Sequence, residues 1–264
     1  MAAPEPVILT RTQGRVRCLT LNRREALNAL NHEVLAALEG EIDAVQRDDA
    51  IGAILLDGSG DRAFCAGADL SELVDLDPIR AHELLQRGQH VIAAVEQLAV
   101  PVVAAVDGYA LGGGCELALA CSLLLASDRS QFGLPEAKLG LMPGYGGTQR
   151  LRRTMGRAPA MAMMLTGRPI DADRAWHLGL LSAPPEAASD LPTVAMSLAS
   201  EIAGLSRPNL ALILESARSS PAGEQGMRHE AALAALAIAS RDGQEGIQSF
   251  QQKRTPAFER GVRR

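Results

Sequence analysis

The sequence is poor in aromatic residues: one Trp, two Tyr and four Phe make up 3% of its 264 residues. Proteins that bind single-stranded nucleic acids stack bases on aromatic side chains, so that class is disfavoured. Acidic residues outnumber basic ones, and the formal charge of −5 gives a surface that repels phosphate backbones. We therefore expect no nucleic-acid partner.

Metal, disulfide and membrane patterns are also missing. The four cysteines form no CxxC pair, and the five histidines show no metal-ligand spacing, so no metal site is expected. No basic start is followed by an apolar run, and no stretch of about 18 uninterrupted apolar residues occurs. These absences predict a cytoplasmic protein with reduced thiols and no membrane partner.

What the sequence does contain, in its first half, is an alternation of short apolar runs and helical stripes. Residues 53–56 and 102–106 lack polar alternation, as strands buried on both faces do. Val91 and Val95 lie on one helical stripe between them, and Asn31 is placed as the N-cap of an earlier helix. The alternation predicts an α/β core with a largely parallel sheet.

Strand signals nearly vanish after about Gly146, and helical stripes replace them. These stripes cover residues 210–217, 230–239 and 246–253. We therefore expect a sheet-bearing core over residues 1–200 and a helical C-terminal region over residues 201–264.

Three consecutive glycines, residues 112–114, lead into a short apolar segment that contains Glu116. A helix starting here exposes backbone N–H groups with partial positive charge, and glycine lets a ligand approach them. Such an end can hold an anion or a developing oxyanion. The alternative is an ordinary glycine-rich helix start, with Glu116 only a favourable partner of the helix dipole. No nucleotide-binding glycine pattern is present.

Two further segments could belong to the same site. Residues 61–69, rich in small side chains, look like a loop after a buried strand, where site loops usually lie, and could supply a second N–H. Cys65 in this segment has no marked histidine partner, which favours a packed thiol over a nucleophile. Glu136 lies in an apolar stretch between two prolines, where a charge is costly unless it is used or paired. A catalytic carboxylate and a salt-bridged structural one both remain open for Glu136.

Together these segments resemble the enoyl-CoA hydratase/isomerase (crotonase) family, and within it most of all the enoyl-CoA hydratases. The resemblance is carried by residues 22–30, 66–69, 101–106, 108–116, 136–151 and 253–258, and thus spans nearly the whole chain. It implies a crotonase-like spiral of ββα units with a helical C-terminal region used for trimerisation. A homotrimer or a dimer of trimers is therefore expected.

The resemblance also implies the site residues. In that family, backbone N–H groups at positions matching Ala68 and Gly113 hold the thioester oxygen, and Glu116 and Glu136 match two glutamates that handle the added water. Contacts with the CoA thioester are expected at Arg24, Ala26, Ala66, Asp69, Leu70 and Lys253. CoA arrives as part of the acyl-CoA substrate, so no separate cofactor is expected.

One CoA contact departs from the family pattern. Many members carry Pro-Lys where this chain has Arg24 and Glu25, so the lysine near the CoA phosphates is absent. Either Arg24 replaces it, or Lys253 reaches it from the C-terminal end, or Arg24 is simply a solvated charge.

Possession of both glutamates favours hydration of a 2-enoyl-CoA to a 3-hydroxyacyl-CoA, a step typical of fatty acid metabolism. The rivals on the same scaffold are an enoyl-CoA isomerase and a branched-chain, methylglutaconyl-type hydratase. A rival of another class is a non-catalytic CoA-ester or RNA-binding relative, which the acidic charge and the glutamate pair disfavour.

Overall fold

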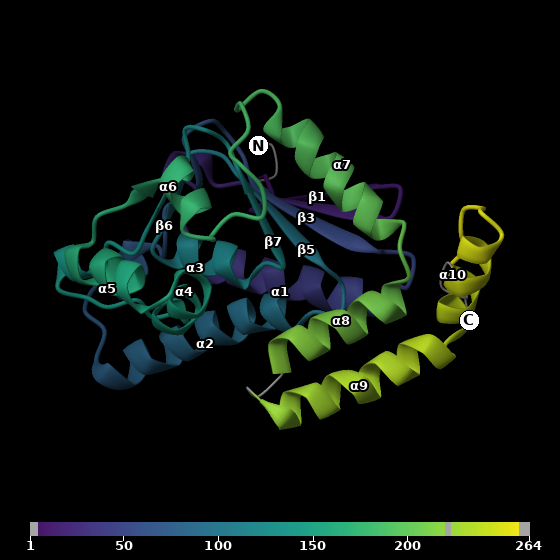
Figure 1. Cartoon of the computed structure of the whole chain (residues 1–264). Helices are drawn as coiled ribbons and strands as arrows, with labels where there is room; N and C mark the ends of the chain where they lie inside the picture. Colours follow the sequence, from purple (N-terminus) through teal and green to yellow (C-terminus); the bar gives the residue numbers. More distant parts are fainter. Residues whose placement is uncertain (1–4, 220–222, 259–264) are drawn as a thin grey trace.

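The computed structural model describes residues 5–219 and 223–258, whose strands form two sheets (Figure 1). The larger sheet has the order β1-β2-β3-β5-β7 and is parallel except for the β1–β2 hairpin. Its strands are β1 (Ile8–Gln13), β2 (Val16–Leu21), β3 (Ala53–Gly58), β5 (Val102–Val106) and β7 (Leu123–Ala126). The smaller sheet has the order β4-β6-β8-β9. Its strands are β4 (Ala63–Cys65), β6 (Tyr109–Leu111), β8 (Gln131–Gly133) and β9 (Ile170–Asp171).

The chain visits the two sheets in turn and then forms a helix. The pairs β3–β4 and β5–β6 lead into α2 (Pro78–Gln97) and α3 (Gly113–Ala120), and β7–β8 leads into α4 (Gly147–Met155). The hairpin β1–β2 precedes α1 (His32–Arg47). The expected spiral of ββα units is therefore confirmed.

Local sequence explains where the two long helices begin. The Asn31 side chain accepts a hydrogen bond from the backbone N–H of Val34, 3.0 Å away, and so caps α1 as predicted. The α1 stripe of Val34, Leu35, Leu38, Ile42 and Val45 is buried. Asp77 caps α2, and Pro78 occupies the first turn, where its missing N–H costs nothing.

The larger sheet is covered on both faces (Figure 1). On one side, α7 (Leu191–Ala203) packs its buried alanines against β3 and β5. On the other side, α1 and α2 bury their apolar stripes in the main core. Burial on both faces explains why β3 and β5 are continuous apolar runs.

After α4 the described chain is helical apart from β9. It contains α5 (Arg157–Thr166), α6 (Ala172–His177), α7, α8 (Arg207–Ser219), α9 (Glu224–Ala239) and α10 (Arg241–Gln251). Figure 1 shows α8 and α9 side by side, with α10 at the end of the molecule away from α3. Among the described residues, no helix is both long and apolar enough to cross a membrane.

The prediction of one sheet, with residues 61–69 as a loop, was wrong in part. Residues 63–65 form β4, a fully buried strand of a second sheet. Three-residue strands are too short to produce a periodic pattern, so β4, β6 and β8 left no strand signal in the sequence.

Candidate active site

Residues 66–69 are held by three backbone hydrogen bonds to the segment 27–30. Ala66 N donates to Leu27 O (3.0 Å), Leu30 N donates to Gly67 O (2.8 Å), and Asp69 N donates to Leu30 O (2.8 Å). The N–H of Ala68, between these bonds, donates to no protein atom within the described parts of the chain. Its backbone group is therefore available to a ligand.

A buried asparagine anchors the same segment. Asn28, 1% exposed, donates to Ser59 O (3.0 Å) and Ala63 O (2.8 Å), and it accepts from the N–H of Arg23 (2.9 Å). These bonds tie the segment to the start of β4. The Asn28 side chain therefore helps to fix the loop from which the Ala68 N–H projects.

The second free N–H belongs to Gly113, the first residue of α3. Gly112 before it has φ +50° and ψ −127°, a conformation reserved for glycine. A Cβ on Gly114 would lie 2.1 Å from Cys65 O, so only glycine lets α3 lie this close to β4. A Cβ on Gly113 would lie 3.2 Å from Ala68 N, which places the two backbone groups side by side. Within residues 5–219 and 223–258, the Gly113 N–H also donates to no protein atom.

Glu116 lies one turn into α3 and is 1% exposed. Its Oε1 accepts two backbone hydrogen bonds, from Tyr145 N (2.8 Å) and Gly147 N (2.6 Å). Both bonds fix the carboxylate in one orientation. Both donors come from outside α3, so Glu116 is more than a partner of the helix dipole.

Glu136 begins the short 3-10 helix η3 (Glu136–Leu139), directly after Pro135. Its Oε1 lies 3.1 Å from the point where a Cβ on Gly112 would be, which brings the carboxylate against the start of α3. Its Oε2 is buried and has no hydrogen-bond partner among the described residues. No salt bridge to Glu136 is present in that part of the chain either, and this removes the structural alternative for the residue.

Both carboxyl groups are harder to ionise than usual. The pKa of Glu116 is raised to about 7, mainly by burial and also by the nearby Glu136, against the opposing effects of the Gly147 and Tyr145 N–H groups and of Arg150. Burial also raises the pKa of Glu136. Near neutral pH the pair can therefore hold one proton, so that one group accepts a proton while the other donates one.

The two free N–H groups and the two carboxyl groups belong to residues that line one cavity. Of the predicted contact residues, Ala66 and Leu70 line it as well. The rest of its wall is mainly apolar and consists of Leu73, Leu85, Leu139, Leu141, Met142 and Tyr145. Sequence reasoning did not identify these residues as a wall, because they come from three segments that only the fold brings together.

Four predicted contact residues do not line the cavity. Arg24 and Ala26 lie on the 3-10 helix η1 (Arg24–Ala26), and the Arg24 side chain is exposed. Asp69 is engaged elsewhere: it pairs with Arg23 at 2.9 Å and caps η2 (Leu70–Leu73) by accepting from Ser71 N. Lys253 follows α10, which lies at the end of the molecule away from α3 (Figure 1).

Comparison with known proteins is consistent with this arrangement. The family model described as enoyl-CoA hydratase/isomerase matches residues 11–261. The chain belongs to the enoyl-CoA hydratase/isomerase family. A probable enoyl-CoA hydratase of Rhizobium meliloti is 42% identical over 255 residues, which cover 95% of this chain and 97% of that protein.

Two further proteins with enoyl-CoA hydratase names are similar to this chain, one in sequence and one in structure. A crotonyl-CoA hydratase of Syntrophomonas wolfei is 37% identical over 262 residues, covering 97% of this chain and 98% of that protein. The crystal structure of an enoyl-CoA hydratase from Bacillus anthracis superposes with a TM-score of 0.92 at 32% identity, covering 97% of this chain and all of that one. The crotonase fold predicted from the sequence is thereby confirmed.

Replacing Glu116 with glutamine should stabilise this family member at pH 8. The folded-state pKa of about 7 lies above the ordinary 4.5, so the folded protein binds the proton more tightly and loses stability as pH rises between these values. At 1.36 kcal/mol per pKa unit, the full loss of folding stability is about 3 kcal/mol. The variant escapes this loss because Gln does not ionise. Urea unfolding from pH 4 to pH 8 should show that the free energy of unfolding of the variant increases, relative to that of the wild type, as pH rises. Parallel stability curves would contradict this.

Proposed function

We propose that the chain is a hydro-lyase that adds water across the 2,3 double bond of a 2-enoyl-CoA to give a 3-hydroxyacyl-CoA. The observation that carries the proposal is the meeting of two free N–H groups and two carboxyl groups at one cavity. Relatives with hydratase names support the same reaction.

In the proposed mechanism, Ala68 N–H and Gly113 N–H donate hydrogen bonds to the thioester oxygen. When the water oxygen bonds to C3, negative charge moves through C2 onto the thioester oxygen, where the two N–H donors stabilise it. One carboxylate takes the proton from water, and the other carboxyl group delivers a proton to C2. The net change is one water added, with OH on C3 and H on C2.

The two glutamates differ in what holds them. Glu116 is fixed by the N–H groups of Tyr145 and Gly147, whereas Glu136 Oε2 has no partner among the described residues. Both therefore keep an oxygen for the same water.

For the CoA part of the substrate we propose Arg24 as a contact, because it replaces the absent lysine and is exposed. Lys253 follows α10, which lies at the end of the molecule away from α3, so we propose that it contacts CoA only from another subunit. No separate cofactor is needed for hydration, and a cytoplasmic location remains our expectation.

The reaction is tested by product analysis. The purified protein should convert crotonyl-CoA into a product heavier by one water, identified by mass spectrometry. With a 3-enoyl-CoA it should form little 2-enoyl product. Rapid interconversion of 3-enoyl and 2-enoyl thioesters without hydration would instead support the isomerase.

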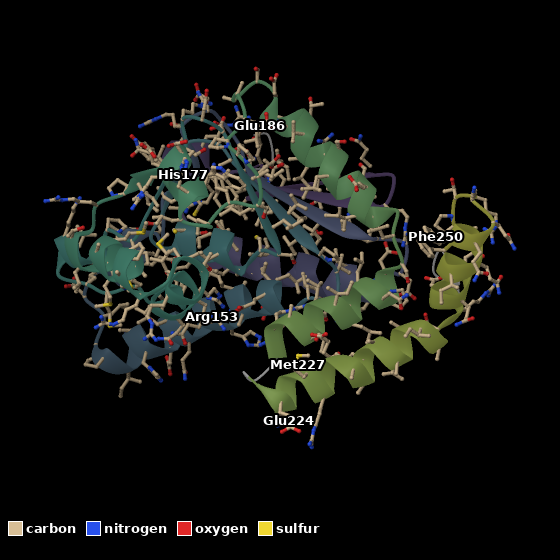
Figure 2. All side chains as sticks on the ribbon, in the orientation of Figure 1. Arg153, His177, Glu186, Glu224, Met227 and Phe250 are labelled. Atoms are coloured by element: carbon tan, nitrogen blue, oxygen red, sulfur yellow. The ribbon has the colours of Figure 1, made fainter. Side chains whose placement is uncertain are left out.

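We also propose that the chain forms a homotrimer or a dimer of trimers through its C-terminal helices. A groove between α8 and α9 has a mainly apolar lining that includes Leu212, Ile213, Leu233, Ala234, Ala237 and Ile238. Phe250 on α10 is 86% exposed, and Figure 2 places it and Met227 on the outer helices. Exposed apolar clusters of this kind are typical of protein contacts.

Changing Ile213 to aspartate should dissociate the oligomer, because the charge would be buried at the contact. Light scattering after size exclusion should show the wild type as a trimer or hexamer and the variant as a monomer. Ile79→Asp is the control, because Ile79 is similarly exposed but lies on α2. A monomeric wild type, or equal dissociation by the control, would argue against this interface.

A further inference from the structure

Tyr145 carries a hydroxyl for which neither the fold nor the proposed hydration has a use. The residue is 3% exposed and lines the same cavity as Glu116 and Glu136. Its backbone is fully engaged: the N–H donates to Glu116 Oε1, and the carbonyl accepts from Arg150 Nη1 at 2.7 Å. The hydroxyl oxygen makes no hydrogen bond to any residue that the structure describes. The hydroxyl is also not among the fully buried atoms of the described residues that lack a partner, so it is open to the cavity, where a ligand can supply the hydrogen-bond partner that a tyrosine hydroxyl usually has.

The tyrosine ring is fixed between two helices. A Cβ on Gly88 of α2 would lie 2.1 Å from Tyr145 Cε1, and a Cβ on Gly113 of α3 would lie 3.0 Å from Cδ2. Both long edges of the ring therefore rest against backbone. Gln89 on α2 also donates to Gly144 O at 2.7 Å, which holds the segment before the tyrosine. The hydroxyl cannot be moved far by rotation of the side chain, so a ligand in the cavity meets it in one position.

The surroundings decide what kind of partner fits. Burial raises the pKa of Tyr145 to about 12, with Glu116, Glu72 and Cys65 adding to the effect, so the group is a neutral donor at physiological pH. Among the described residues that line the cavity there is no Lys, Arg or His, and two are glutamates. A carboxylate on the ligand would be repelled and would lack a counter-ion. A neutral oxygen can accept the hydrogen bond without that cost.

The rest of the wall limits the ligand further. Apart from the catalytic carboxyls and the Tyr145 hydroxyl, the side chains that line the cavity are apolar. Such a pocket accepts a hydrocarbon chain, and outside the catalytic carboxyl groups it can hydrogen-bond a polar group of that chain only at the Tyr145 hydroxyl.

We propose that the Tyr145 hydroxyl donates a hydrogen bond to a neutral oxygen on the acyl chain, so that this enzyme prefers 2-enoyl-CoA thioesters with a hydroxyl or carbonyl group beyond C3. The proposal deepens the hydratase function and rests on it. It makes Tyr145 a specificity-determining residue rather than a participant in the proton transfers.

The test compares Tyr145→Phe with the wild type on matched six-carbon thioesters. These are 2-hexenoyl-CoA, its 4-, 5- and 6-hydroxy derivatives, its 5-oxo derivative and the 6-carboxylate. The ratio of kcat/KM for the best oxygenated substrate to kcat/KM for 2-hexenoyl-CoA should fall about 5- to 50-fold in the variant. Tyr109→Phe is the matched control, because it is the only other tyrosine, is 41% exposed and does not line the cavity.

A binding measurement separates this proposal from the hydratase proposal. Saturated hexanoyl-CoA and its hydroxy derivatives cannot be hydrated, and calorimetry gives their Kd with both proteins. The hydroxy compound should bind more tightly than hexanoyl-CoA to the wild type only, even if no thioester is hydrated. Equal losses on plain and oxygenated ligands, no loss on either, or a preference for the carboxylate would each overturn the proposal.

Discussion

Replacing Glu136 with glutamine should lower kcat for crotonyl-CoA hydration by about 10²- to 10⁴-fold, the range expected when a positioned acid or base is lost. Gln has nearly the same shape, so the cavity keeps its form, but an amide can neither take the proton from water nor deliver one to C2. Because Glu136 Oε2 has no protein partner among the described residues, the change breaks no hydrogen bond of the fold there. The unfolding midpoint and KM should therefore change little.

The same substitution should also change the pKa of Glu116. The charge on Glu136 contributes to the raised pKa of Glu116, so removing that charge should move the pKa of Glu116 below about 7. Difference infrared spectroscopy of the Glu116 carboxyl group across pH 5 to 9 would measure this. Glu33→Gln, an exposed substitution on α1, is the control and should leave both kcat and this pKa unchanged. Full turnover by Glu136→Gln would dismiss the proposed role of that residue.

The elements that could be predicted are those with long, strongly patterned segments. The buried stripe and Asn31 cap of α1, the apolar runs of β3 and β5, and the glycine-led start of α3 all lie where their patterns indicated. Hydrophobic spacing and capping are local properties, so one stretch of sequence is enough to reveal them. The second sheet had no such pattern, because its strands are two or three residues long.

The site shows a similar division. Glu116 and Glu136 stood out as charges in apolar segments, and the structure brings both to one cavity. The backbone N–H groups of Tyr145 and Gly147 that fix Glu116 had no signal, because a backbone donor can come from almost any residue type. The apolar wall and the Tyr145 hydroxyl depend on tertiary packing. The distance of α10 from α3 likewise depends on chain path, which spacing does not encode.

Removing the Ala68 N–H should cost about 10²- to 10³-fold in kcat, as expected for the loss of one donor to a developing oxyanion. The clean change is an amide-to-ester substitution, in which residue 68 is incorporated as the α-hydroxy analogue of alanine. The methyl side chain remains and only the N–H is replaced by oxygen. Since this N–H donates to no protein atom within the described residues, the fold loses no hydrogen bond, and only the bond from Leu30 N to the Gly67 carbonyl is weakened, because an ester oxygen is a poorer acceptor. Binding of the ground-state thioester should weaken less than kcat falls, because charge on the oxygen is largest in the transition state.

The matched control is the same ester at Ala257, whose N–H donates to Glu245 Oε1 at 2.8 Å on the exposed C-terminal segment. That substitution does remove a hydrogen bond, yet it lies beyond α10 and should leave kcat unchanged. The ester at residue 257 removes a hydrogen bond of the fold and should leave turnover unchanged. The ester at residue 68 removes none and should nearly abolish turnover. If both esters lowered kcat equally, or if the ester at residue 68 had no effect, the thioester oxygen would not be held between Ala68 and Gly113. The two glutamates would then lack the enolate-stabilising partner on which their proton transfers depend.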